Sequence, residues 1–169
     1  LIIKKYPNII YILVGDGPEM DNLKILAKKL NVDEKILFVG EVPYGKLGRG
    51  QFAYYQACDI FLMPSRIDKN DGTVEAFGIT YLEAGACRKP VVGGLTGGIS
   101  EAVLDGENGF LVNPEKPNEI ASAVIEIFDS PSLSDLMGKR GKELASKNSW
   151  SNVAINYENL LYQIIHNKI

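Results

Sequence analysis

Two glutamates, Glu75 and Glu83, are the residues whose type and spacing could do chemistry. They stand in the stretch VEAFGITYLEAGA, residues 74–86. The apolar pattern of this stretch predicts a helix over about 78–87, so that Glu75 precedes the helix and Glu83 lies one turn inside it. A carboxylate only accepts hydrogen bonds, and it can accept two from a pair of neighbouring hydroxyl groups.

The surroundings of Glu83 favour a ligand. At 100° per residue, Ile79, Leu82 and Ala86 are expected to form an apolar stripe, and Glu83 projects close to it. An unpaired carboxylate is costly to bury, so Glu83 has to meet donors or solvent in a cleft. From spacing alone a second interpretation is equally open. Glu75 would then be a solvated loop residue, and Glu83 a surface residue of the helix paired with Arg88 or Lys89.

The start of this helix predicts an anion site. Ala76, Phe77 and Gly78 supply none of the side chains that usually cap a helix. The first backbone N–H groups are therefore expected to be unclaimed, and such groups bind phosphate well. With one carboxylate before these amides and one after them, the ligand suggested is a diphosphate that joins two sugars.

Two glycine-bearing turns are weaker candidates. Gly97 and Gly98 follow an expected strand and open a helix, which would let a ligand approach the backbone, although a tight turn explains them too. The stretch GDGPEM begins like a dinucleotide-binding fingerprint, but Met20 occupies the third glycine position, so a plain turn is favoured. Asp68 and Asp71 lack the ligand order of a calcium loop.

The elements that position these residues alternate along the chain. Short runs rich in β-branched residues predict strands, and each run is followed by a helical pattern. Such an alternation predicts the α/β class, with a Rossmann-like parallel sheet covered by helices on both faces and ligands beyond the carboxyl ends of its strands. Strands are expected at 9–14, 35–40, 60–65, 89–94 and 109–114, and further helices at 19–30, 51–59, 99–106, 117–130, 133–148 and 149–167.

Composition excludes several classes of protein. The 169 residues fit one domain, and the net charge of −3 gives no basic field to attract nucleic acid. Cys58 and Cys87 form no disulfide framework, and we expect packed free thiols in a reducing compartment. With His166 as the single histidine, a His/Cys metal site is not expected.

The motifs resemble the C-terminal domain of retaining GT-B glycosyltransferases of the family-4 type (glycosyl transferases group 1). Glu75 and Glu83 match the E-x7-E pattern of that family. The surrounding stretches match in order: VGDGP, FVGEVP, ACDIFLMPSR, TGGISEAVLDGENGFLVNP and a late SW. The resemblance spans nearly the whole chain. It implies that residues 1–169 form a nucleotide-sugar-binding domain, the C-terminal half of a GT-B fold.

The resemblance also implies roles for individual residues. Glu75 would be the catalytic-site carboxylate that faces the hydroxyls of the donor hexose. Glu83 would hold the ribose, and Val42 would lie by the base through its main chain. The donor sugar and diphosphate would contact or border Phe77, Gly78, Ile79, Gly97 and Gly98.

This chain departs from the family in three places. Ala76 and Arg88 stand where the family usually has glycine, and the loop PYGKLGRGQ is longer than common. The family's Arg and Lys diphosphate clamp would precede Leu1. The N-terminal edge of the domain and the N-terminal acceptor domain are therefore expected to be missing, and this chain alone to be inactive.

The resemblance implies transfer of a hexose, mannose or glucose first, from a UDP-, GDP- or ADP-sugar with retention of configuration. It implies no cofactor or metal, and a glycan or lipid-linked acceptor bound through the missing domain. The location would be cytoplasmic, in solution or peripheral to a membrane. The base, the hexose and the acceptor stay open. The alternatives are a GT-B epimerase, a phosphorylase, or a binding module without catalysis.

Overall fold

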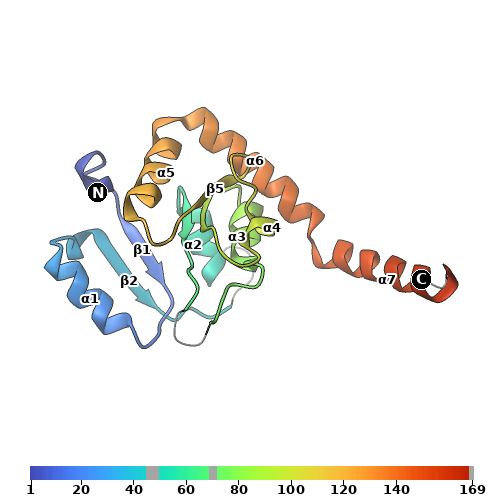
Figure 1. The fold of residues 1–169 in the computed structure, drawn as a ribbon. Coiled ribbons are helices and arrows are strands. Elements are labelled where there is room, and N and C mark those ends of the chain that lie inside the picture. Colours follow the sequence, from blue (N-terminus) through green and yellow to red (C-terminus); the bar gives the residue numbers. More distant parts are fainter. Residues whose placement is uncertain (45–49, 69–71, 168–169) are drawn as a thin grey trace. The chain divides into compact units, whose positions relative to one another are not determined.

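The computed structural model describes residues 1–44, 50–68 and 72–167 (Figure 1). Contacts divide the chain into two compact units, Leu1–Ala57 and Cys58–Ile169. Two features from the sequence analysis lie outside the described residues. These are Asp71 and residues 45–49 of the predicted loop PYGKLGRGQ.

The first unit contains one pair of parallel strands. Strands β1 (Tyr11–Val14) and β2 (Ile36–Gly40) run in register until a shift between Leu13 and Val14. The unit also contains η1 (Ile2–Lys4), α1 (Met20–Lys29), η2 (Asp33–Lys35) and α2 (Gln51–Ala57).

The second unit contains a parallel sheet of order β3-β4-β5. Its strands are β3 (Phe61–Met63), β4 (Val91–Gly94) and β5 (Gly109–Val112). All four residues of β4 are buried, and neighbouring residues of a strand face opposite sides, so both faces of the central strand are covered. The helices are α3 (Ile79–Ala86), α4 (Ile99–Ala102), α5 (Pro117–Asp129), α6 (Pro131–Lys147) and α7 (Trp150–Asn167).

The predicted α/β class with parallel strands is confirmed. Each expected strand and helix is present, with the strands shorter than the apolar runs because the runs extend into turns. The reason for parallel pairing is visible in the connections, since every strand of the second unit is joined to the next through a helix (Figure 1).

The packing of α3 depends on small residues. A Cβ atom added to Gly85 would lie 2.8 Å from the carbonyl oxygen of Gly141 in α6, so the two backbones approach directly. A Cβ on Gly138 would lie 3.0 Å from the carbonyl carbon of Arg88. Glycine at these positions lets α6 lie against α3 without side chains between them.

The predicted apolar stripe on α3 is wrong. The buried residues are Tyr81, Ala84 and Gly85, whereas Ile79 is 51% exposed and Ala86 is also exposed. The reason is the small-residue contact with α6, which places the glycine-containing face inward. Of the three residues predicted for the stripe, Ile79 and Ala86 are therefore exposed and Leu82 is half-buried.

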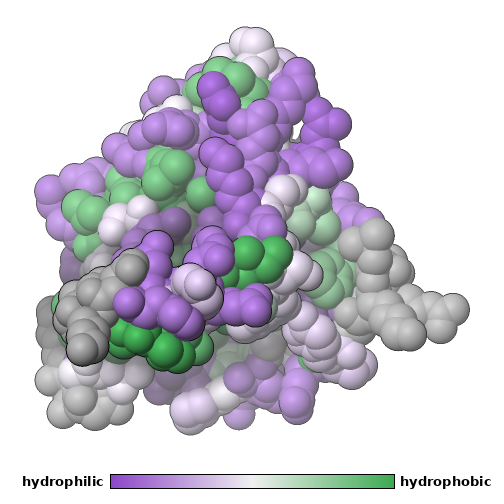
Figure 2. All heavy atoms as spheres, turned by 90° about the vertical axis from the view of Figure 1, so that its right-hand side faces the viewer, coloured by the Kyte–Doolittle hydropathy of each residue, from purple (hydrophilic) through white to green (hydrophobic). Residues whose placement is uncertain are grey.

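The last helix, α7, is exposed along its length. All side chains from Trp150 to His166 are exposed, and its apolar residues include Trp150, Tyr157 and Ile165 at 78%, 66% and 71%. Figure 2 views the molecule from the α7 side, and hydrophobic residues lie there beside hydrophilic ones. Among the described residues, no helix has both the length and the hydropathy to cross a bilayer.

Helix α3 ends in a Schellman motif with an arginine in the left-handed position. The Lys89 amide donates to the Ala84 carbonyl (3.1 Å) and the Arg88 amide to the Gly85 carbonyl (2.8 Å). Arg88 has φ +59°, a conformation that costs a residue with a Cβ about 1–2 kcal/mol. This is the position at which the resemblance described above implies glycine, and the turn forms here with arginine instead.

We predict that Arg88→Gly raises the free energy of unfolding by up to about 1 kcal/mol, because relief of the left-handed strain exceeds the backbone entropy that glycine loses on folding. The substitution also removes an exposed ion pair with Asp135 (3.8 Å), which contributes little. Urea unfolding measures the change. Asp135→Asn removes this ion pair together with the closer pair of Asp135 with Lys139 (2.6 Å), so its effect is an upper limit for the loss of the Arg88 pair. A loss of stability in Arg88→Gly beyond that of Asp135→Asn would contradict the explanation.

Candidate functional site

Glu75 closes the turn that leads into α3. Its Oε1 atom accepts a hydrogen bond of 3.1 Å from the amide of Gly78, and its side chain is half-buried. Gly78 is the N-cap of the helix and has φ +86°, which glycine adopts without strain. Glu75 is therefore fixed at the positive end of α3, where a carboxylate is electrostatically favoured.

The prediction that the first amides are unclaimed holds in part. The Gly78 amide already donates to the Glu75 carboxylate, which extends forward along the chain from three residues before the N-cap. The amides of Ile79 and Thr80 carry no hydrogen bond within the part of the chain that the structure describes. Two N–H donors at the start of α3 thus remain for a ligand, next to the Glu75 carboxylate.

Tyr81 packs against this turn, although no motif in the sequence marks it as a site residue. A Cβ on Gly78 would lie 2.6 Å from Cε2 of the Tyr81 ring, so the ring fills the space under Gly78. The Tyr81 hydroxyl donates to the carbonyl oxygen of Met63 at the end of β3. The pKa of Tyr81 is raised to about 12, mainly by burial and in part by the nearby Glu75 carboxylate, against the lowering effect of a hydrogen bond with Ser65.

The turn after β4 lies against Glu75. The Gly98 amide donates to the Glu75 carbonyl (3.1 Å), and the Thr96 hydroxyl donates to the Ser65 carbonyl (3.0 Å). The turn containing Gly97 and Gly98, predicted to border the ligand, is thus adjacent to Glu75. That either glycine touches a ligand stays a prediction.

Glu83 lies on α3 one residue from the buried Ala84, and its side chain is half-buried. Burial raises the pKa of Cys87, one turn along the helix, and the negative charge of Glu83 adds to that effect against the lowering effect of Lys89. Arg88, one of the two partners in the alternative interpretation, faces Asp135 instead. Glu83 lies one turn along α3 from the exposed Ile79, and its role as a ligand-binding residue stays a prediction.

The remaining predicted residues are placed as follows. Phe77 is half-buried between Glu75 and the N-cap of α3. Val42 belongs to the first unit, two residues after β2 ends, and is half-buried. Cys58 and Cys87 are free thiols. Within the described ranges, no cluster of three His, Cys, Asp or Glu side chains could hold a metal ion.

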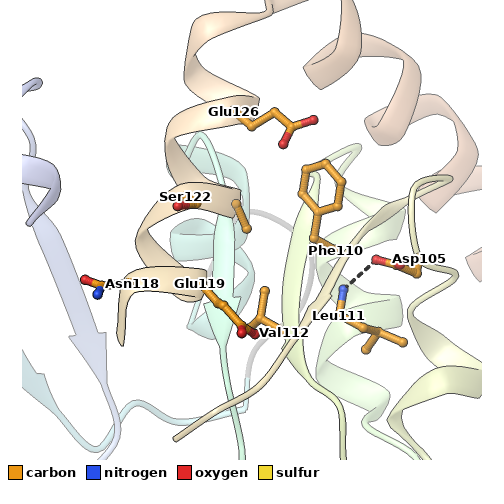
Figure 3. Close-up of a pocket in the computed structure, with 9 residues that line it drawn as sticks. Asp105, Phe110, Leu111, Val112, Asn118, Glu119, Ser122 and Glu126 are labelled. Carbon is orange, nitrogen blue, oxygen red and sulfur yellow. Dashed lines mark hydrogen bonds between the residues drawn. The ribbon is translucent and has the colours of Figure 1, made fainter. Parts of the chain in front are cut away.

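A pocket of about 410 Å³ lies elsewhere in the second unit, between β5 and α5 (Figure 3). Two of its carboxylates satisfy backbone amides. Asp105 Oδ1 accepts from the Leu111 amide (2.9 Å), and Glu119 Oε2 accepts from the Asn113 amide (3.2 Å). None of the predicted site residues lines it, and two of its acidic residues, Asp105 and Glu119, already accept hydrogen bonds from amides in and just after β5.

Comparisons with known proteins identify the family of this chain. Residues 1–144 match the family described as Glycosyl transferases group 1. A curated relative is the GDP-mannose-dependent alpha-(1-6)-phosphatidylinositol monomannoside mannosyltransferase of Mycolicibacterium smegmatis. It is 35% identical over 145 residues, which are 86% of this chain and 37% of the relative.

Solved structures share the fold. Sucrose-phosphate synthase from Thermosynechococcus elongatus superposes with a TM-score of 0.77 at 27% identity, over 97% of this chain and 40% of that one. HepE of Anabaena in complex with UDP-glucose gives a TM-score of 0.73 at 28% identity, over 90% and 40% of the two chains. The chain thus spans about two fifths of the length of these proteins. The resemblance stated from the motifs is confirmed.

We predict that Tyr81→Phe lowers the free energy of unfolding at neutral pH by about 1–3 kcal/mol, because the Met63 carbonyl loses its donor. The variant also tests the pKa. An unfolded tyrosine ionises near pH 10 and the folded Tyr81 near 12, so the unfolded state binds fewer protons between these values. The contribution of this pKa shift to the free energy of unfolding is constant below pH 10. It decreases as the pH rises toward 12, by about 1.4 kcal/mol per pH unit at most.

Urea unfolding between pH 7 and 12 measures both effects. The stability of the wild type should decline more steeply above pH 10 than that of Tyr81→Phe. Tyr157→Phe is the matched control, since Tyr157 is 66% exposed. Loss of its hydroxyl should change neither the stability at neutral pH nor the decline above pH 10. Parallel pH curves for wild type and Tyr81→Phe would contradict the assignment.

Proposed function

Because the chain belongs to the glycosyl transferases group 1 family, we propose that it is the donor-binding domain of a retaining hexosyltransferase. The donor is a nucleotide-diphosphate sugar, and the hexose is mannose or glucose. One observation carries the proposal. The Glu75 carboxylate is fixed beside two available amides at the start of α3, and Glu83 lies one turn further along the helix.

Each part of this arrangement suits one part of such a donor. The Ile79 and Thr80 amides donate to the diphosphate, and the helix dipole favours its charge. Glu83 accepts hydrogen bonds from the ribose hydroxyls, and Glu75 from hydroxyls of the hexose. The assignment of Val42 to the base rests on the family resemblance alone, and Gly97 and Gly98 border the donor pocket. The relatives support this donor class, since one is GDP-mannose-dependent and one was solved with UDP-glucose.

The reaction needs positioning and charge stabilisation. The bond between the anomeric carbon and the phosphate oxygen breaks, and its electron pair leaves with the nucleoside diphosphate. The amides at the start of α3 stabilise that charge. The acceptor hydroxyl bonds to the anomeric carbon on the face that the diphosphate leaves, and its proton passes to the leaving phosphate. Glu75 stabilises positive charge that develops on the sugar ring.

The whole protein, of which this chain covers about two fifths by comparison with its relatives, carries the activity. A glycan or lipid-linked acceptor binds through the remainder, so residues 1–169 alone are inactive. No cofactor or metal takes part in this proposal, and the location is cytoplasmic or peripheral to a membrane.

We predict that Glu83→Ala weakens binding of the free nucleotide diphosphate by about 1.5–3 kcal/mol, because hydrogen bonds to a charged group are lost. This corresponds to an increase in Kd of roughly ten- to a hundredfold or slightly more. Calorimetry of the full-length protein with UDP, GDP and ADP measures the change and also identifies the base. Glu107→Ala removes an exposed carboxylate outside the site and should leave Kd unchanged. An unchanged Kd in Glu83→Ala would reject the ribose role.

We predict that Glu75→Gln lowers kcat/KM for transfer strongly and leaves the Kd of the free nucleotide diphosphate nearly unchanged. Glutamine keeps an oxygen that can accept from the Gly78 amide, so the turn is preserved while the charge is removed. That charge acts mainly in the transition state. Turnover and calorimetry are measured side by side, and the anomeric configuration of the product is read by NMR. Equal losses in both quantities would make Glu75 a nucleotide-binding or structural residue, and an inverted product would reject retention.

A further inference from the structure

We propose that Gly98 is a positioning residue for Glu75, acting through the main chain of residues 75 and 76. The inference rests on the proposed function of Glu75. It assigns to the glycine pair a role that is separate from any contact with a ligand.

Glu75 is held at two points. Its carbonyl oxygen accepts a hydrogen bond from the Gly98 amide (3.1 Å), and its carboxylate accepts one from the Gly78 amide (3.1 Å). The first bond fixes the main chain of Glu75, and the second fixes its side chain. The direction of the carboxylate therefore depends on the turn after β4 as well as on α3.

The contact leaves no room for a side chain on either glycine. A Cβ on Gly98 would lie 2.9 Å from the carbonyl carbon of Ala76 and closer still to its oxygen. A Cβ on Gly97 would lie 2.6 Å from Cγ2 of Val74, and Gly97 has φ +55°. The obstructing atoms at Gly98 belong to backbone, which cannot rotate away as the end of a long side chain can.

The turn after β4 is the firmer of the two segments. Gly94 before it and Ile99 after it are buried, and the Thr96 hydroxyl is bonded to the Ser65 carbonyl at 3.0 Å. Ala76 on the other side is exposed. A Cβ at residue 98 is thus expected to move the segment 75–76 outward, and Glu75 with it. The start of α3 stays in place because Tyr81 is fully buried under Gly78.

The test compares chemistry with nucleotide binding in the full-length protein. Gly98→Ala should lower kcat/KM for transfer on the order of a hundredfold, the effect of a displacement of about 1 Å at a reacting centre. The Kd of UDP or GDP, whichever the wild type binds, should stay at the wild-type value. In the Glu75→Gln background, Gly98→Ala should lower kcat/KM much less, because both substitutions impair the same function of Glu75.

Gly17→Ala is the matched control, since a Cβ there meets no atom within 4 Å and φ is not positive. It should keep wild-type turnover. If Gly98→Ala does not fold, Thr96→Val replaces it in the same cycle, because it loosens the turn without adding a clash. Its loss of turnover should also shrink in the Glu75→Gln background.

The outcomes separate the two proposals. Wild-type protein that neither binds a nucleotide diphosphate nor transfers a hexose refutes the proposed function. The positioning claim is then decided by the crystal structure of the Gly98→Ala variant, in which an undisplaced Glu75 overturns it. If the wild type is active, three results for Gly98→Ala would each overturn the positioning role. These are unchanged turnover, a loss of turnover that adds fully to that of Glu75→Gln, and a parallel loss of nucleotide affinity.

Discussion

Direct contact between backbones is the constraint on which the second unit depends. Helix α3 meets α6 where a Cβ atom would not fit, with Gly85 against the main chain of Gly141. Gly98 adds a second contact of this kind, against the main chain of Ala76 just before the helix. Backbone atoms cannot change rotamer, so a helix held in this way has little freedom to shift. The position of Glu75 and of the amides after it is therefore largely set before any ligand binds.

The charge at the start of α3 follows from the same turn. Glu75 accepts from the Gly78 amide and so occupies part of the positive end of the helix. A diphosphate bound to the next two amides would lie beside this carboxylate, and the two negative groups would repel each other. A hexose between them, with hydroxyls that donate to Glu75, separates the charges. Under the proposed function, the arrangement suits a diphosphate that carries a sugar, and it is compatible with the roles that the family resemblance implies for Glu75 and Glu83.

The sequence predicts the elements better than the contacts between them. Alternating strand and helix patterns give the parallel sheets, because each pattern is local. The buried face of α3 could not be derived, since it is decided by glycines of α6 more than fifty residues later in the chain. Hydropathy favours Ile79 for the core, whereas Gly85 has no hydropathy signal of comparable size. The carboxylate cap was missed because glutamate is not a usual N-cap residue and acts here from three positions away.

The same limit applies to Gly97 and Gly98. A glycine pair after a strand allows close approach of a ligand or of another part of the chain, and the sequence does not distinguish the two. The structure identifies the approaching group as the main chain of Glu75 and Ala76, together with the side chain of Val74. Tyr81 was missed for a related reason, since an aromatic residue in an apolar helix gives no sign of what its hydroxyl binds.

The two departures from family glycines differ in their physical effect. Among the described residues only Asn31 and Arg88 combine a side chain with a positive φ, so Ala76 has an ordinary backbone and its methyl group is exposed. Alanine is therefore tolerated there, and the loop that holds Glu75 keeps its hydrogen bond to Gly98. Arg88 does adopt the left-handed conformation, but it lies at the far end of α3 from Glu75. The strain is thus confined to the end of the helix that faces α6, and the end proposed to bind the donor carries none of it.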